Sequence, residues 1–156
     1  MAMELGDLDD LYRDAILDHC RHPRKGDLLK DPDAAARAVN PFCGDEVDLQ
    51  LVFQDGLVAD VGAQSVGCSI NQASSSMLSE AVDGRTLEDV ESLTALFKRM
   101  MGGNVFTKEE LDPLGDLRNL AGVLQFPVRI KCALLSWSAL TEAIQELRMQ
   151  HARPER

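Results

Sequence analysis

The sequence predicts an α+β fold, in which a small antiparallel sheet of three strands carries helices packed on one face. Two neighbouring runs, 47–54 and 59–65, alternate apolar and polar residues as half-buried strands do, and Asp55-Gly56 between them is typical of a two-residue hairpin turn. One helical segment precedes the strands and three follow them. The chain has 156 residues, of which 45% are hydrophobic. This is enough for a substantial core, so we expect residues 1–156 to form a single domain.

The chain up to the hairpin is expected to form a helix, a loop and a short strand. Apolar residues recur at helical spacing in the first segment, namely Leu8, Leu11, Tyr12, Ala15 and Ile16. This helix should end near Cys20, before His22-Pro23. Residues 23–32 contain prolines and a glycine among polar residues, which is typical of an extended loop. Ala38 to Phe42 should then form a short strand that leads to Cys43.

Each of the two hairpin strands should bury one side. The inward-facing residues are expected to be Val47, Leu49, Leu51 and Phe53 in the first strand and Ala59, Val61, Ala63 and Ser65 in the second. Gly67-Cys68 ends the second strand. Ser69 and Gln72 match the S-x-x-Q capping box, so a helix should start at once and stop at Asp83-Gly84. Its buried stripe should consist of Ile70, Ala73, Met77 and Ala81.

Two further helices are expected beyond Gly84. Thr86 resembles an N-cap, and the helix that follows it should end at Gly102-Gly103. Its apolar stripe is Leu87, Val90, Leu93, Phe97 and Met100. Residues 107–120 are polar and broken by a proline and a glycine, which favours short helical turns in a long connection. Pro127 suits the first turn of the last helix. The stripe of that helix should be Ile130, Leu134, Trp137, Leu140, Ile144 and Leu147.

The charge balance and the apolar pattern exclude several classes of protein. The formal net charge is −10, which disfavours a nucleic-acid partner because such binding needs a cationic face. No apolar run is long enough to span a membrane, so no membrane partner is expected. The first ten residues are acidic and no apolar stretch follows them, so we expect no secretory signal and a cytoplasmic protein.

The four cysteines are Cys20, Cys43, Cys68 and Cys132, and no CxxC pair occurs. Three of them lie at edges of expected elements: one in a turn before a strand and two near helix starts. A helix start lowers the pKa of a nearby thiol, which favours thiolates at Cys68 and Cys132. Gly44 permits a tight turn, so Asp45 can reach the same point as Cys43. Three thiolates and one carboxylate suffice for a tetrahedral metal site.

Each cysteine alone is better explained as a small buried core residue, because a free thiol packs well as a hydrophobe. The combination of three cysteines at element edges with a Gly-Asp pair favours the metal site. Cys20 lies at a helix end with no turn beside it and is interpreted as structural or incidental. His19, His22 and His151 lie at the end of the first helix or in the tail and receive no ligand role. The serines 74–76 lack a partner base, so we expect small residues that allow close helix packing.

Three motifs occur in a fixed order along the chain. They are Asn40-Pro41-x-Cys43-Gly44-Asp45, Gly67-Cys68-x-Ile70-x-x-Ala73-Ser74-x-Ser76-Met77-x-x-Glu80 and Pro127-x-Arg129-x-x-Cys132-Ala133-x-Leu135-x-Trp137. They resemble the IscU/SufU/NifU N-terminal family of iron–sulfur assembly proteins, and the first helix with Pro23-Arg24 resembles that family too. The resemblance extends from about Leu8 to Leu147.

Departures from the IscU pattern indicate the SufU type. IscU scaffolds carry a histidine directly before the third cysteine as an alternative ligand, and Lys131 stands in that place here. Their Leu-Pro-Pro-Val-Lys segment is matched only in part by residues 125–129, and the chain is longer around residues 102–122. Two residues depart from the SufU-like pattern itself: Cys20 stands where tyrosine is usual and Asn71 where serine is usual, but neither is an expected ligand.

The resemblance implies a SufE/IscU-like fold and a role in iron–sulfur cluster assembly. It implies that Cys43, Asp45, Cys68 and Cys132 bind zinc, and that Cys43 accepts persulfide sulfur from a cysteine desulfurase of the SufS type. The sulfur would then pass to a downstream iron–sulfur scaffold or to apo-protein acceptors. Whether such a sulfurtransferase is itself an enzyme or a carrier that acts with one stays open.

Two basic residues accompany the third cysteine. Arg129 lies three residues before Cys132, so it should share a helix face with that cysteine and help to dock the desulfurase. Lys131 adds positive charge beside Cys132 without supplying a ligand. Two alternatives to the sulfurtransferase remain. An IscU-like scaffold would assemble a labile [2Fe–2S] cluster on the same four residues, labile because a hard carboxylate replaces a thiolate. The other is a structural zinc domain in an interaction protein.

Overall fold

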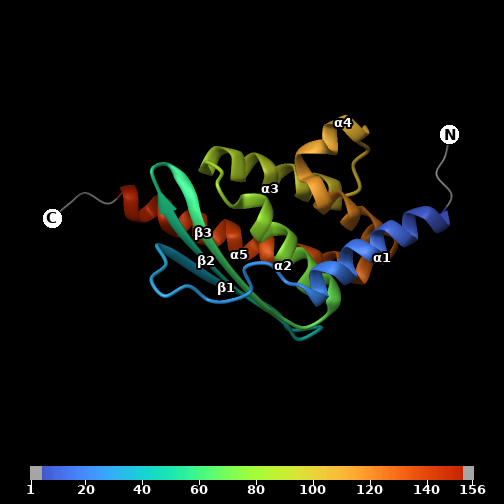
Figure 1. Cartoon of the computed structure of the whole chain (residues 1–156), viewed down its shortest axis with the longest axis horizontal. Coiled ribbons are helices and arrows are strands. Elements are labelled where there is room, and N and C mark those ends of the chain that lie inside the picture. The colour runs from blue at the N-terminus through green and yellow to red at the C-terminus, as the bar shows by residue number, and fades with distance from the viewer. Residues whose placement is uncertain (1–4, 153–156) are drawn as a thin grey trace.

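The structure is a computed structural model that describes the backbone of residues 5–152 and the side chains of residues 13–150. Its elements follow in the order α1 (Leu5–Arg21), β1 (Ala34–Asn40), β2 (Asp45–Gln54), β3 (Leu57–Val66), α2 (Ser69–Val82), α3 (Leu87–Met101), α4 (Lys108–Leu111), the 3₁₀ segment η1 (Asp112–Gln125) and α5 (Pro127–Ala152). The strands form one antiparallel sheet, and α2 and α5 pack against the same face of it (Figure 1). The predicted α+β fold is confirmed. Within the described residues, every helix is too short or too polar to cross a bilayer.

The sheet follows the alternation that the sequence predicts for its central strand. In β2, the side chains of Val47, Leu49 and Leu51 are buried against the helices, and those between them are half-exposed on the other face. Asp55 and Gly56 form the turn to β3 with positive φ values of 55° and 79°. Such a turn matches the right-handed twist of the flanking strands, so the predicted hairpin is confirmed.

The first strand differs from its prediction in position. It occupies Ala34–Asn40 rather than Ala38–Phe42, and its last residue pairs with Asp45 at the start of β2. Residues 41–44 therefore form a turn beyond the end of the sheet instead of continuing the strand. This turn carries Cys43.

The returning strand contains a bulge that the sequence pattern does not reveal. Val52 pairs with Asp60 and Phe53 pairs with Val58, which leaves Ala59 as an extra residue in β3. Val58 is therefore buried and Ala59 exposed, the reverse of the prediction for this end of the strand. Beyond the bulge, the predicted inward orientation is restored.

The helix starts follow the sequence in α3 and depart from it in α2. Thr86 caps α3 as predicted, because its hydroxyl accepts a hydrogen bond from the Asp89 N–H. In α2 the N-cap is Cys68, one residue before the predicted cap, and no side chain caps this helix. The Gln72 amide donates instead to the Gly67 carbonyl at 3.0 Å, so the predicted capping box is wrong.

Where their side chains are described, most residues of the predicted helical stripes are buried, and the rest (Ala15, Ala81, Leu87, Ile130 and Leu134) are half-buried against the same core. Ile16 of α1 is buried, while the side chains of Leu8, Leu11 and Tyr12 lie outside the described part of the chain. The predicted long connection contains α4 and η1, and Pro127 begins α5.

The core is centred on α5. Trp137 is fully buried and stacks on Phe97 with the ring centroids 4.6 Å apart. The indole N–H donates to the Ser74 hydroxyl at 3.3 Å, and that hydroxyl donates to the Ala133 carbonyl at 2.6 Å. The serines 74–76 are buried, which confirms that small residues let α2 approach its neighbours closely. This packing fixes the start of α2 relative to α5.

Candidate metal centre

Four predicted ligands meet at the end of the sheet where the turn 41–44 and the start of α2 lie (Figure 1). Asp45 is the first residue of β2, Cys68 is the N-cap of α2, and Cys132 lies in the second turn of α5. The ligand atoms of Cys43, Asp45 and Cys132 all lie within 4.8 Å of one another. Cys68 Sγ lies 3.4 Å from Asp45 Oδ2. The fold thus brings three of the four predicted ligands into one compact group, and Cys68 contacts that group through Asp45 but lies outside it.

The Asp45 carboxylate lies at the centre of this group. It is fully buried, its Oδ1 accepts a 2.8 Å hydrogen bond from the Cys68 N–H, and its Oδ2 lies 3.1 Å from Cys43 Sγ. Gly67 makes this approach possible, because its φ is 128° and a Cβ there would overlap the carboxylate. Sequence reasoning missed this role of Gly67, since the contact joins two segments that are distant in the chain.

Cys43 lies on a turn that is held by two hydrogen bonds to Asn40. The Gly44 N–H donates to the Asn40 carbonyl at 2.9 Å, and the Asn40 side-chain oxygen accepts a 3.2 Å hydrogen bond from the Phe42 N–H. Gly44 has a φ of 72°, which an L side chain rarely adopts. Cys43 is exposed, whereas the other two candidate cysteines are half-buried and buried. Its thiol is therefore the most accessible of the three to a second protein.

Two of the candidate ligands have pKa values shifted in opposite directions. Burial alone raises the pKa of Asp45, but the hydrogen bonds from the Cys68 N–H and from the three thiols outweigh it, so this pKa is lowered. Burial, followed by the hydrogen bond to the Asp45 carboxylate, raises the pKa of Cys132 well above the usual thiol range. The predicted thiolate at Cys132 is thus wrong for the metal-free protein. Cys132 lies more than a turn inside α5, where the helix start has little effect.

The separations among Cys43, Asp45 and Cys132 are close to those of a tetrahedral metal site, whereas Cys68 Sγ does not lie within 4.8 Å of every other ligand atom. Two thiolates bound to one zinc ion at ~2.3 Å lie ~3.8 Å apart, and a thiolate and a carboxylate oxygen lie ~3.6 Å apart. The sulfur atoms of Cys43 and Cys132 are 3.7 Å apart, and those of Cys43 and Cys68 lie 3.1 Å and 3.4 Å from Asp45 Oδ2. Three sulfur donors and one oxygen donor suit zinc or an iron–sulfur cluster by ligand type. The residues could therefore hold either group once the Cys68 side chain moves closer to the other two thiols.

The two basic residues lie beside these candidate ligands. Arg129 is exposed, and its interaction with the Cys68 side chain raises the pKa of its guanidinium. Lys131 Nζ lies 5.6 Å from the centre of the Phe42 ring, a favourable cation–π distance. Phe42 precedes Cys43 directly, and sequence reasoning missed it because an aromatic residue in a turn carries no motif.

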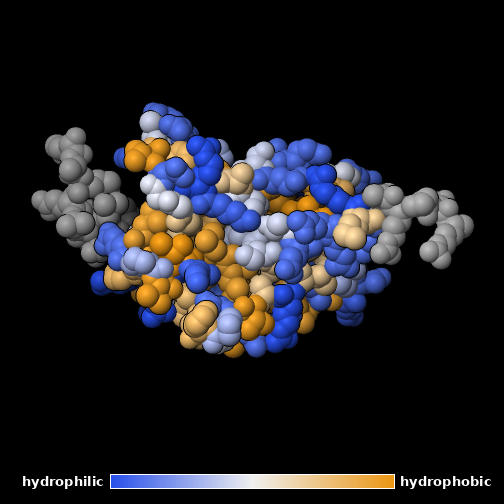
Figure 2. All heavy atoms as spheres, turned by 180° about the vertical axis from the view of Figure 1, so that it is seen from behind, coloured by the Kyte–Doolittle hydropathy of each residue, from blue (hydrophilic) through white to orange (hydrophobic). Residues whose placement is uncertain are grey.

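An open cavity of about 680 Å³ lies over the candidate ligands. Its lining consists of Asn40, Phe42, Cys43, Cys68, Pro127, Val128, Arg129, Lys131 and Cys132. Phe42 and Val128 leave 89% and 84% of their surface exposed. Figure 2 shows that apolar side chains gather over the left half of the rear face of the molecule. Exposed apolar surface of this kind beside a cavity is typical of a contact with another protein.

Cys20 lies outside this group. Its Sγ donates a hydrogen bond to the Ser69 carbonyl at 3.2 Å, which ties the end of α1 to the first turn of α2. Burial raises the pKa of the Cys20 thiol, so the neutral form is favoured. This environment agrees with the structural interpretation of Cys20.

Known proteins are similar to this chain in both sequence and fold. The family model of the NifU-like N-terminal domain matches residues 11–154. The zinc-dependent sulfurtransferase SufU of Bacillus subtilis (strain 168) is 40% identical over 137 residues, which cover 88% of this chain and 91% of that protein. The iron–sulfur cluster assembly scaffold protein IscU of Streptococcus pyogenes serotype M1 is 39% identical over 145 residues, which cover 92% of this chain and 88% of that protein.

A solved structure extends this agreement to three dimensions. The crystal structure of a nitrogen-fixing NifU-like protein (N-terminal) from Brucella abortus matches with a TM-score of 0.81 at 26% identity, covering 92% of this chain and 98% of that chain. The family match, the sequence relatives and the fold all extend over most of the chain. The chain therefore belongs to the family of the NifU-like N-terminal domain, which includes the IscU and SufU proteins.

Proposed function

We propose that this chain is a zinc-dependent sulfurtransferase, or sulfur carrier, in iron–sulfur cluster assembly. In this proposal Cys43, Asp45, Cys68 and Cys132 hold the zinc ion, and Cys43 accepts persulfide sulfur from a cysteine desulfurase of the SufS type. The observation that carries it is the convergence of three thiols on one buried carboxylate, with Cys43 alone exposed. The 40% identity to a protein named a zinc-dependent sulfurtransferase supports the same activity.

Bound zinc would keep the ligand thiols deprotonated and would add no redox chemistry. The Cys43 thiolate attacks the outer sulfur of the donor's persulfide. One S–S bond forms on Cys43 as the S–S bond of the donor breaks, and the donor cysteine leaves as a thiolate. The transferred sulfur keeps its proton, and the transfer needs neither an oxidant nor a reductant.

Cys43 is the ligand best placed to leave the site for this reaction. It is exposed and lies on a turn next to Gly44, so its movement costs little packing. Cys132 is buried within α5, and Cys68 is fixed by the start of α2. Asp45 is fixed as well, because it accepts a hydrogen bond from the Cys68 N–H. The three remaining ligands would therefore keep the site in shape while Cys43 reacts.

The surface around Cys43 suits a protein donor. Phe42 and Val128 expose apolar area that a partner would bury, and Arg129 offers a guanidinium that can hold a carboxylate in a bidentate pair. We expect an acidic residue of the desulfurase to contact Arg129. Downstream, a scaffold or an apo-protein acceptor would take the sulfur from Cys43 at the same surface.

An IscU-like scaffold that assembles a labile [2Fe–2S] cluster on the same residues is the alternative. Lys131 counts against it, because a lysine replaces the histidine that offers an additional ligand in that group. The open cavity above the four residues would admit a partner side chain or a small cluster. The metal content of the isolated protein separates the two functions, since zinc gives no visible absorbance and an iron–sulfur cluster does.

Mass spectrometry tests the sulfur transfer directly. The zinc-loaded protein is incubated with a SufS-type desulfurase and cysteine, and the added sulfur is then located by peptide mapping. We expect one sulfur atom on Cys43, no added sulfur in Cys43→Ser, and an unchanged result in the control Cys20→Ser. Sulfur on Cys132 with none on Cys43 would overturn the mechanism. Cluster absorbance after addition of iron, with no persulfide on any cysteine, would favour the scaffold.

A further inference from the structure

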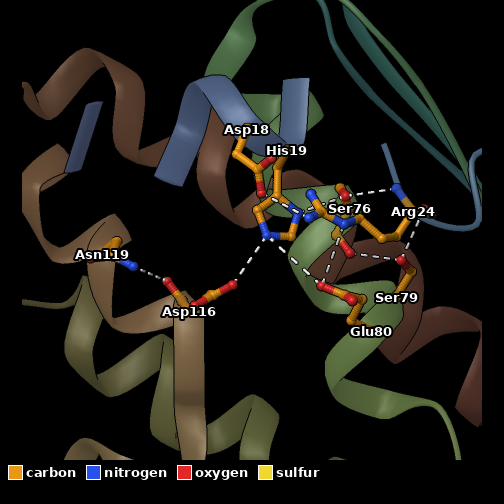
Figure 3. Close-up of polar contacts among 8 residues, drawn as sticks. All are labelled: Asp18, His19, Arg24, Ser76, Ser79, Glu80, Asp116 and Asn119. Atoms are coloured by element: carbon orange, nitrogen blue, oxygen red, sulfur yellow. Dashed lines mark hydrogen bonds and ion pairs between the residues drawn. The ribbon is translucent and has the colours of Figure 1, made fainter. Parts of the chain in front are cut away.

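A second group of metal-binding side chains lies where α1, α2 and η1 meet (Figure 3). His19 comes from the last turn of α1, Glu80 from α2 and Asp116 from η1. Glu80 follows Cys68 by twelve residues along α2, so the two groups are separated by about 18 Å at ~1.5 Å per residue. Sequence reasoning gave His19 no ligand role, because its neighbours come from segments far away in the chain.

The spacing of the three ligand atoms suits a cation better than it suits direct hydrogen bonds. His19 Nε2 forms a long hydrogen bond of 3.3 Å with Asp116 Oδ2 and lies 3.9 Å from Glu80 Oε1, and all three atoms lie within 4.8 Å of one another. A direct N–H···O bond is usually ~2.9 Å long. Two ligands bound to one cation at ~2.1 Å lie ~3.0–3.4 Å apart in octahedral or tetrahedral geometry. A cation can bind between these atoms if the Glu80 carboxylate moves slightly closer to His19 Nε2.

The His19 ring can offer a lone pair to such a cation. Its Nδ1 lies 2.7 Å from the Ser76 hydroxyl oxygen, which also accepts a 2.9 Å hydrogen bond from the Arg24 N–H. That hydroxyl can donate to Nδ1 or accept from it, so either neutral tautomer of His19 is satisfied on this side. With the hydrogen on Nδ1, the Nε2 lone pair faces two carboxylates. A second hydrogen bond that fixes the ring is the usual arrangement for a metal-binding histidine.

The charge and exposure of this group also favour a cation. Three carboxylates, those of Asp18, Glu80 and Asp116, lie near one guanidinium, that of Arg24, which pairs chiefly with Asp18 at 2.7 Å. Arg24 Nε lies 3.8 Å from Glu80 Oε1, so this ion pair is loose. His19 is 1% exposed, whereas the side chains of Glu80 and Asp116 are 50% and 68% exposed. A cation can therefore enter from solvent and keep some of its bound water. It would bind the His19 imidazole, whose position is fixed in the core.

We propose that His19, Glu80 and Asp116 bind one first-row divalent cation, with water completing its coordination. One nitrogen and two carboxylate oxygens suit Mn²⁺, Fe²⁺ or Zn²⁺ rather than a soft, thiolate-seeking ion. The bound cation ties the end of α1 to η1 across α2. This site shares no ligand with the cysteine group, so the proposal does not depend on the sulfur-transfer function.

Binding of Mn²⁺ to the zinc-loaded protein tests the proposal, because Mn²⁺ prefers oxygen and nitrogen ligands and leaves the thiolate site to zinc. Titration followed by electron paramagnetic resonance counts the bound ions. We expect one Mn²⁺ per chain, with affinity at least tenfold weaker in Glu80→Gln and in Asp116→Asn. Both side chains are at least half exposed, so both variants should fold. Asp112→Asn is the matched control, since Asp112 is an equally exposed acid of η1 and pairs with Arg118.

Crystals soaked in Mn²⁺ give the position of the ion by anomalous scattering. We expect a peak within bonding distance of His19 Nε2 and of oxygens from Glu80 and Asp116. Equal weakening in the Asp112→Asn control would show that general negative charge attracts the ion, and that result overturns the site. A peak elsewhere, or Mn²⁺ binding that both site variants leave unchanged, overturns it as well.

Discussion

Replacing Gly67 by alanine perturbs the Asp45 carboxylate without replacing any candidate ligand. The new Cβ would overlap that carboxylate, and a φ of 128° is a conformation that L side chains rarely adopt. The backbone strain costs ~1–3 kcal/mol. Forcing Asp45 away would also leave the Cys68 N–H without its 2.8 Å hydrogen bond, at a cost of ~1–3 kcal/mol for a buried unpaired group. We expect the free energy of unfolding of the metal-free protein to fall by ~2–6 kcal/mol in total.

Gly84→Ala is the matched control for backbone strain. Gly84 also has a positive φ, 79°, but a Cβ there would meet nothing within 4 Å. The residue lies beyond the far end of α2 from the cysteines. We therefore expect a loss of only ~1–2 kcal/mol from strain and an unchanged affinity for zinc. In Gly67→Ala the displaced carboxylate should weaken zinc binding by ~10–100-fold, as loss of a supporting contact at a metal site commonly does.

Two measurements decide between these outcomes. Urea unfolding of the reduced, metal-free proteins gives the free energies of unfolding, and competition with a chromophoric chelator gives the zinc affinities. The reasoning about Asp45 is refuted if Gly67→Ala loses no more stability than Gly84→Ala and binds zinc as tightly as the unchanged protein.

Cys68→Ser and Cys132→Ser should each lose most of the bound zinc and melt at a lower temperature, because a metal bound by the folded state adds to its stability. Elemental analysis measures the zinc content and thermal unfolding the melting temperature, with Cys20→Ser as the control. Unchanged zinc in both variants would contradict the ligand assignment. Arg129→Ala should keep its zinc but raise the apparent KM for stimulation of the desulfurase in steady-state kinetics, whereas an ordinary surface charge would leave KM unchanged. The raised pKa of Cys132 predicts that the metal-free protein loses stability as the pH rises above the ordinary thiol pKa of about 8.5, since the unfolded chain then releases a proton that the folded chain retains. Urea unfolding from neutral to alkaline pH measures this slope, and Cys132→Ser should flatten it.

The features that the sequence predicts correctly depend on residues a few positions apart. The alternation in β2, the turn at Asp55-Gly56 and the cap at Thr86 each follow from a short segment and its local geometry. The candidate ligands also follow from local context, because each cysteine lies at the edge of an element that its own neighbours define. The family motifs then place those edges in a known order.

The features that the sequence does not predict depend on contacts between distant segments. The bulge at Ala59 arises from the pairing of β3 with β2. Helix α2 begins after Cys68, whose N–H donates a hydrogen bond to the Asp45 carboxylate. The need for glycine at position 67 comes from the same contact. The group around His19 joins α1, α2 and η1, so no single segment contains its pattern.

The turn that carries Cys43 is closed by the pairing of Asn40 with Asp45, which limits how far any group on that cysteine can travel. Cys43 is two residues from Asp45, and two extended residues span at most ~7 Å. The turn therefore allows Cys43 to move only a short distance from the other candidate ligands. In the proposed sulfur transfer, the donor or acceptor has to bring its own reactive group to this end of the sheet. Delivery over a longer distance then requires the whole domain to move from one partner to the next.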